Sequence, residues 1–175
     1  MREVRRLVPS DFDQYYETRL AALVESPAAY ATDAEAWRTA SRSTIERHLQ
    51  RSADEPGSPI LGAWEQDDLI GLVGISREQR PSVAHKAGLW GWHVRPEFRH
   101  QGVGRSLVTA AISAARTAEG LRQLRAVVPA SGAAALSLLE SEGFKRFGLE
   151  PDARRMDTGF VDQVYLWYLL EADRV

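Results

Sequence analysis

Hydrophobic and polar residues follow two spacings along this chain, one typical of strands and one typical of helices. Apolar runs bounded by turn residues predict strands at residues 2–8, 60–64, 69–76, 83–94, 124–128, 144–149 and 163–170. Apolar residues at helical spacing predict helices at residues 9–24, 33–51, 107–118 and 133–142. The chain has no internal repeat, and 44% hydrophobic content over 175 residues suits a single domain spanning residues 1–175.

A glycine-rich turn joins the predicted strand at residues 83–94 to the helix that follows it. Gly102 and Gly104 carry no Cβ, so successive backbone N–H groups can point into one concavity and a ligand can approach closely. The first turn of the helix adds N–H donors and a positive dipole end, and Arg99 and Arg105 add full charges. The segment therefore predicts a site for an anionic phosphate. The alternative is an ordinary turn that needs glycine for its backbone angles.

Composition and charge narrow the classes of protein to which the chain can belong. A formal net charge of −2 and a pI near 6.1, without a run of basic residues, argue against nucleic acid as a partner. The absence of cysteine excludes disulfides, thiolate nucleophiles and cysteine-bound zinc. The N-terminus is charged within its first six residues, and no apolar run is long enough to span a bilayer. We therefore expect a cytoplasmic protein without a membrane partner.

Three segments of the chain resemble the GNAT superfamily of acetyl-CoA-dependent N-acetyltransferases. Residues 94–104 (VRPEFRHQGVG) are similar to the loop that binds the acyl-CoA pyrophosphate in that family. Residues 135–144 (ALSLLESEGF) are similar to the helix and the Gly-Phe strand start that come later, and residues 159–170 resemble the closing strand. The resemblance covers almost the whole chain. It implies an α/β (α+β) fold with a mixed, mostly antiparallel, twisted sheet flanked by helices.

Carried onto this chain, the resemblance assigns the donor side of the site. It implies transfer of an acetyl group from acetyl-CoA to a primary amine by direct attack in a ternary complex, with no metal. Val94 would offer backbone groups to the pantetheine arm, and Arg99 would shape or charge the loop. A backbone N–H near His93 or Val94, at a bulge in the strand, would stabilise the oxyanion. The backbone N–H groups that would cradle the pyrophosphate run from Gln101 through Gly102, Val103 and Gly104 to Arg105.

The chain departs from the family pattern at two positions. Leu139 stands where many members have a tyrosine that protonates the leaving thiolate, and Gly132 stands where many have an asparagine. Ser131, beside Gly132, is a hydroxyl that could assist thiolate departure in place of the tyrosine. These departures keep two alternatives to an active enzyme open. One is an acyl-CoA-binding domain with weak or lost turnover, and the other is a structural interaction domain.

Two residues are candidates for the general base that takes the proton of the amine. His93 lies at the end of the predicted donor strand, and an unperturbed histidine pKa suits that task at neutral pH. Glu78 lies near the end of the preceding strand. The alternative for His93 is a histidine packed among neighbouring tryptophans, and the alternative for Glu78 is a surface carboxylate.

The acceptor side of the site carries no motif. Trp90 and Trp92 occupy alternate positions, so we expect both on one face of the strand, either in the core or as an aromatic wall for the acceptor. Acidic residues in the first predicted helix, Glu25 among them, fit attraction of a cationic amine and equally a solvated helix face. The acceptor is therefore predicted only as a small-molecule or protein amine, and a homodimer stays open.

Overall fold

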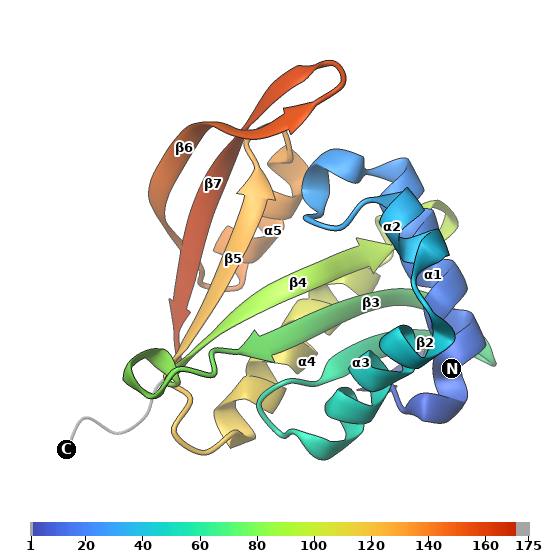
Figure 1. The fold of residues 1–175 in the computed structure, drawn as a ribbon. Helices are drawn as coiled ribbons and strands as arrows, with labels where there is room; N and C mark the ends of the chain where they lie inside the picture. Colours follow the sequence, from blue (N-terminus) through green and yellow to red (C-terminus); the bar gives the residue numbers. More distant parts are fainter. Residues whose placement is uncertain (1, 171–175) are drawn as a thin grey trace.

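The computed structural model describes residues 2–170 and consists of one twisted sheet with helices on both faces (Figure 1). The strands are β1 (Arg2–Arg6), β2 (Ile60–Glu65), β3 (Asp68–Arg77), β4 (Lys86–Val94), β5 (Gln123–Pro129), β6 (Lys145–Met156) and β7 (Gly159–Leu169). The helices are α1 (Phe12–Glu25), α2 (Ala34–Thr39), α3 (Arg42–Asp54), α4 (Val103–Thr117) and α5 (Ala133–Ser141). None of the helices within residues 2–170 is long and apolar enough to cross a bilayer.

The sheet confirms the predicted mixed, mostly antiparallel arrangement. Its strand order is β1-β2-β3-β4-β5-β7-β6, and β4 with β5 is the parallel pair among these strands. This pair is joined only at one end, where Lys86–Gly88 lies against Gln123–Arg125. Beyond that joint the two strands diverge, as Figure 1 shows. The sheet therefore contains an open wedge between β4 and β5.

Two apolar clusters hold the helices against the sheet. The larger one lies under α4 and α5, where Leu107, Val108 and Ala111 of α4 are fully buried. The other packs α1 and α3 against β2 and β3 through Tyr15 and Leu49, which are also fully buried. Apolar residues at helical spacing along α4 therefore face the sheet, as their pattern predicts.

Two predicted elements differ from the structure for local reasons. The predicted helix at residues 33–51 is two helices, because Ala40 and Ser41 are extended and the Ser41 side chain caps α3 by accepting from the Thr44 N–H at 3.3 Å. The predicted strand at residues 83–94 starts only at Lys86, because Pro81–Val83 forms a short 3-10 turn.

The hairpin of β6 and β7 is longer than the sequence pattern predicts. β6 continues to Met156, whereas the apolar pattern predicts its end at residue 149. The pairing register shifts between Arg146 and Gly148 and again between Glu150 and Arg154. Such bulges bend a strand and interrupt the apolar alternation on which sequence prediction depends. The hairpin consequently projects from the sheet and forms one wall of the wedge (Figure 1).

Candidate functional site

The glycine-rich turn forms an open helix N-terminus, as its pattern predicts. Gly102 adopts a left-handed conformation with φ +82° at the start of α4. The Ser106 N–H donates to the Gly102 carbonyl at 3.0 Å and makes the first hydrogen bond of the helix. The N–H groups of Val103, Gly104 and Arg105 precede that bond, so the helix leaves them available. This arrangement of donors, together with the helix dipole, suits a phosphate.

The two glycines of the turn serve different purposes. A Cβ on Gly102 would meet nothing within 4 Å, but the positive φ would strain any other residue there. A Cβ on Gly104 would lie 3.4 Å from Trp92, 3.5 Å from Leu138 and 3.7 Å from Val94. The backbone angle therefore requires glycine at position 102, and the limited space favours a small residue at position 104.

The arginines of the turn, which we expect to add full charges, are each paired with a carboxylate. Arg99 donates from Nε to the Val94 carbonyl at 3.0 Å and from Nη2 to the Glu25 carboxylate at 2.6 Å. Arg105 forms an ion pair with Glu142 and donates to the Ser141 hydroxyl at 3.1 Å. Because a carboxylate offsets each guanidinium, the free donors of the turn belong to the backbone.

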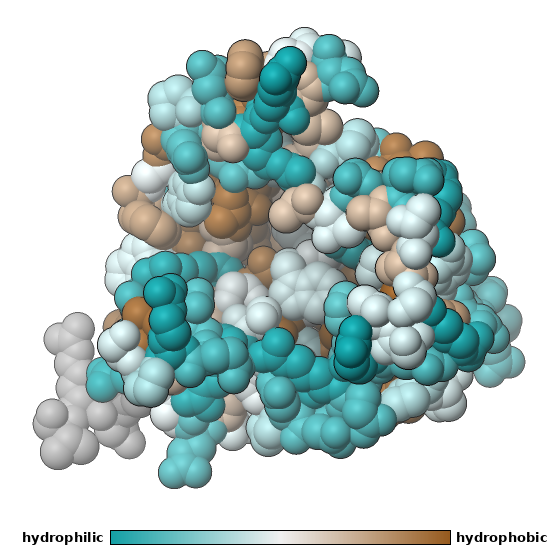
Figure 2. Space-filling model, viewed as in Figure 1, coloured by the Kyte–Doolittle hydropathy of each residue, from teal (hydrophilic) through white to brown (hydrophobic). Residues whose placement is uncertain are grey.

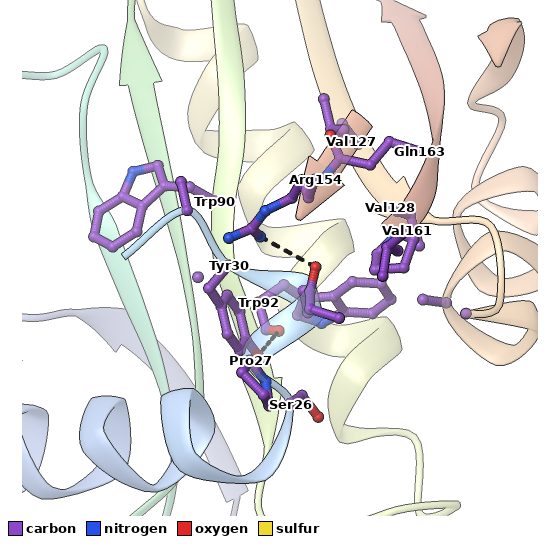
Figure 3. A pocket seen from close by; sticks show the side chains of 18 of the residues that line it. Ser26, Pro27, Tyr30, Trp90, Trp92, Val127, Val128, Arg154, Val161 and Gln163 are labelled. Atoms are coloured by element: carbon purple, nitrogen blue, oxygen red, sulfur yellow. Dashed lines mark hydrogen bonds between the residues drawn. The ribbon is translucent and has the colours of Figure 1, made fainter. Parts of the chain in front are cut away.

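A cavity of about 1040 Å³ occupies the wedge between β4 and β5. Figure 2 shows a hollow below the projecting hairpin, with apolar and weakly polar residues inside and polar ones around the rim. The walls come from the middle of β4, the end of β5, the turn after α1 and the β6–β7 hairpin (Figure 3). In that view the guanidinium of Arg154 reaches from the hairpin and donates to the Ala28 carbonyl at 3.1 Å.

A bulge in β4 lines this cavity. Leu72 of β3 pairs with His93 and Gly74 pairs with Trp90, so Gly91 and Trp92 together face a single residue of β3. Gly91 has φ +67°, which is typical of a bulge residue. The predicted bulge near His93 or Val94 is therefore present but lies closer to the start of the strand.

The bulge reverses the expected orientation of the two tryptophans. Trp90 packs against the cluster under α1, whereas Trp92 packs against the cluster under α4. The prediction that both lie on one face is wrong, because the extra residue at the bulge shifts the alternation of side chains by one position. Both tryptophans nevertheless line the cavity.

Tyr30 contacts the bulge and was not predicted from the sequence. Its hydroxyl donates to the Trp92 carbonyl at 3.0 Å (Figure 3). Burial raises the pKa of this hydroxyl, so it is protonated at neutral pH. Tyr30 follows Pro27–Ala29, a short 3-10 turn whose sequence carries only a helix-breaking signal.

His93 is buried beside the C-terminal end of α1. Its side chain is 3% exposed, and Nδ1 lies 3.9 Å from Glu25 Oε2, while Nε2 has no hydrogen-bond partner among residues 2–170. Burial lowers the pKa of His93 to about 4, although the Glu25 carboxylate opposes the shift. The imidazole is therefore neutral at pH 7. Among residues 2–170, Glu25 and Trp92 line the cavity but His93 does not. This agrees with the alternative that His93 is a packed histidine.

Glu25 is the carboxylate that the structure places on the cavity wall. The hydrogen bond from Arg99 lowers the pKa of Glu25 more than its partial burial raises it, so the group is negative at neutral pH. Glu78 is exposed beyond the end of β3 and lines a separate hollow of about 400 Å³. The two hollows share Leu89 and Trp90. The structure therefore brings Glu25, and not Glu78, to the main cavity.

The residues at the two departures from the family pattern also line the cavity. Leu139 projects from α5 and is 1% exposed, while Ser131 and Gly132 precede that helix. Leu139 is part of the apolar cluster under α4 and α5. It therefore contributes an apolar side chain, without a hydroxyl, to the cavity wall.

Comparison with known proteins places this chain in a family. The model of the Acetyltransferase (GNAT) family matches residues 19–144. No curated protein matches the chain at a significant level. The match to the family model extends over more than half of the chain, from the middle of α1 to the end of the turn after α5.

Solved structures of acetyltransferases share the fold over nearly their full length. A GNAT-family acetyltransferase from Streptococcus pneumoniae is 22% identical, with a TM-score of 0.87, over 98% of this chain and 100% of that chain. A putative acetyltransferase from Salmonella typhimurium, solved with acetyl-CoA, is 20% identical, with a TM-score of 0.86, over 100% and 97%. A phosphinothricin acetyltransferase from Sinorhizobium meliloti, solved with acetyl-CoA, is 19% identical, with a TM-score of 0.83, over 97% and 88%. The chain described here belongs to the acetyltransferase (GNAT) family.

Proposed function

We propose that this protein transfers an acetyl group from acetyl-CoA to a primary amine in a ternary complex. One observation carries the proposal: the open N-terminus of α4 follows β4, the strand that borders the wedge between β4 and β5. A phosphate held at the helix N-terminus would lie beside Val94 and Trp92, whose strand leads into the cavity. The solved structures with acetyl-CoA from Salmonella and Sinorhizobium share this fold.

The residues of the turn and the wedge fit an acyl-CoA donor. Backbone N–H groups at Val103, Gly104 and Arg105 would hold the pyrophosphate, since both loop arginines are already paired with carboxylates. From Leu89 onward β4 is not paired with β5, so its edge would accept an extended pantetheine arm in place of a strand. The Val94 carbonyl already accepts from Arg99, so other main-chain groups of β4 would contact the arm.

The chemistry that the donor supplies is a thioester carbonyl open to attack by an amine. The bulge at Gly91 and Trp92 frees main-chain groups of β4 from regular pairing, and a backbone N–H there would stabilise the oxyanion. The Glu25 carboxylate, whose Oε2 accepts from Arg99, would also accept a hydrogen bond from the ammonium form of the acceptor in the cavity. Water would then carry away the amine proton, because His93 does not reach the cavity surface.

The test of this function is thiol release from acetyl-CoA with a broad panel of amines, combined with calorimetric binding of acetyl-CoA. We expect micromolar to millimolar binding and thiol release that depends on the amine. Binding without release for any amine would favour the alternative of an acyl-CoA-binding domain without turnover, which Leu139 and Gly132 suggest. Absence of binding would contradict both proposals.

A second prediction concerns how the thiolate leaves. Leu139 cannot donate a proton, so we expect the single-turnover rate to depend strongly on the acidity of the leaving thiol. The rate should rise about tenfold for each two units by which the thiol pKa falls, as for a Brønsted coefficient of about 0.5. Leu139→Met should retain this dependence and cost under about 1.5 kcal/mol in stability. A flat dependence would indicate a proton donor on the cavity wall, with Ser131 and Tyr30 as the hydroxyls to replace first.

The finer features of the acceptor and the assembly stay predictions. The fold is compatible with a small-molecule amine and with a protein amine. A cytoplasmic location is an expectation that cell fractionation would test. A homodimer is an expectation that gel filtration would test.

A further inference from the structure

Arg19 is a buried cation without an anionic partner. It lies in α1, is 5% exposed and lines the main cavity. Within residues 2–170 it makes neither a hydrogen bond nor an ion pair, and its Nη1 is fully buried without an acceptor. Buried charges in proteins are normally paired or hydrogen-bonded, because an unpaired one loses its hydration without compensation. Arg19 is therefore a group that lacks its complement.

Aromatic rings hold the guanidinium in place but give it no acceptor. The guanidinium carbon lies 4.5 Å from the ring centre of Tyr30 and 5.6 Å from that of Trp90. These contacts stabilise the positive charge through the ring faces. The N–H groups of a guanidinium point outward in its plane, where they need oxygen acceptors. Among the described residues the guanidinium lies over the Tyr30 ring and makes no hydrogen bond to the Tyr30 hydroxyl, which donates to the Trp92 carbonyl.

The position of Arg19 relates it to the reacting centre. Its Nη1 would lie only 3.3 Å from a Cβ on Gly91, so the guanidinium lies against the bulge of β4. An anion bound by Arg19 would therefore be close to the place where the amine must attack. Arg154, another guanidinium of this cavity, already donates to the Ala28 carbonyl and comes from the opposite wall.

We propose that Arg19 binds a carboxylate of the acceptor, and that the acceptor is an amine of the α-amino acid class. This inference rests on the proposed function. A carboxylate matches the planar fork of a guanidinium, and the short distance from Arg19 to the bulge requires the amine and the carboxylate to be few bonds apart. Glu25 also lines the cavity, and its carboxylate, which accepts from Arg99, offers a further acceptor for the ammonium group.

The remaining walls fit an apolar side chain on this acceptor. Val127 and Val128 of β5 and Val161 of β7 line the cavity (Figure 3). Trp92 also faces the cavity, beside the bulge. A zwitterion with an apolar or weakly polar side chain would therefore complement the charges of α1 and the apolar surface of the hairpin and β5.

The experiment compares matched acceptors in the wild type and in Arg19→Met. The panel consists of L-amino acids, each with its amide and with the amine that lacks the carboxylate. We expect kcat/KM of the wild type for the best amino acid to exceed that for its amide, and that for the amine without the carboxylate, by at least about tenfold. A tenfold difference is the equivalent of one charge-assisted hydrogen bond. Arg19→Met should lose this preference while acetyl-CoA binds as tightly as to the wild type. Arg47→Met, which removes an exposed arginine of α3 outside the cavity, should retain the preference.

Several outcomes separate this inference from the proposed function. Thiol release that is equally fast with amines lacking a carboxylate, in both wild type and Arg19→Met, would overturn the role of Arg19 and leave the acetyltransferase function intact. Failure to bind acetyl-CoA would contradict the function itself. If Arg19→Met does not fold, the melting temperature of the wild type can be measured with each compound instead. The best amino acid should raise this temperature more than its decarboxylated amine does. Equal shifts with the two compounds would overturn the inference.

Discussion

Gly104→Val is expected to weaken acetyl-CoA binding about tenfold to a hundredfold, equivalent to the ~1–3 kcal/mol typical of an overpacked site. A Cβ at this position would already contact Trp92 and Leu138 at 3.4 and 3.5 Å, so we expect the two further methyl groups of valine to crowd these side chains. They would displace the first turn of α4 or the wall of the wedge, where the N–H groups would face the proposed pyrophosphate. Calorimetric titration with acetyl-CoA measures the loss.

Two variants show whether the loss comes from crowding or from backbone angles. Gly104→Ala should bind nearly as the wild type does, because its Cβ makes only ordinary contacts. Gly102→Ala should cost about 1–2 kcal/mol in stability, because its residue must keep a positive φ. Circular dichroism and thermal unfolding report whether each variant is folded. A folded Gly104→Val protein with unchanged affinity would mean that the turn does not hold the donor.

His93 is expected to make the protein lose stability as the solution is acidified from pH 6.5 towards pH 4. The folded pKa of about 4 lies below the ordinary value of 6.5, so the unfolded chain binds a proton first. Stability therefore increases with pH across this window and is highest above it. The difference between the two pKa values corresponds to roughly 3 kcal/mol from this one group.

The comparison that isolates this effect is urea unfolding of wild type and His93→Leu at several pH values. Carboxylates such as Asp11, whose pKa is held down by Arg5 and the Val8 N–H despite burial, also lose stabilising charge in acid. They contribute to both proteins, so the difference between the two pH profiles belongs to His93 and to its contact with Glu25. Parallel profiles would show that His93 already binds its proton at the ordinary pKa and is less buried than the structure indicates.

Most of the fold and the glycine-rich turn of the candidate site were predictable because local sequence determines them. The turn requires glycine at position 102 for its backbone angle, and α4 has a regular apolar spacing. The family and the sheet architecture followed from the resemblance of three segments of the chain, and both are confirmed. The sequence pattern does not separate α2 from α3. The capping residue, Ser41, is one of several serines in that segment. It offers no signal stronger than its neighbours.

The acceptor side was less predictable because tertiary contacts build it. Arg19, Glu25 and Tyr30 lie on or just after α1, where a single sequence gives no reason to distinguish them from a solvated helix face. Only the packing of α1 against the bulge in β4 places Arg19 next to Gly91. The bulge itself inverted the expected side of Trp90 against Trp92, since nothing in the residue alternation shows that Gly91 has a positive φ.

The interrupted register of β6 has a consequence for the solubility of the whole sheet. β6 is the last strand of the sheet and is 12 residues long, with Phe147 and Leu149 exposed on it. A straight edge of that length with such side chains would invite strand addition and fibrillar aggregation. Its two register shifts, together with Pro151 and the left-handed Asp152, divide the free edge into segments too short to template another chain. The same irregularities that let the hairpin bend over the cavity therefore also protect the protein from self-assembly through its edge.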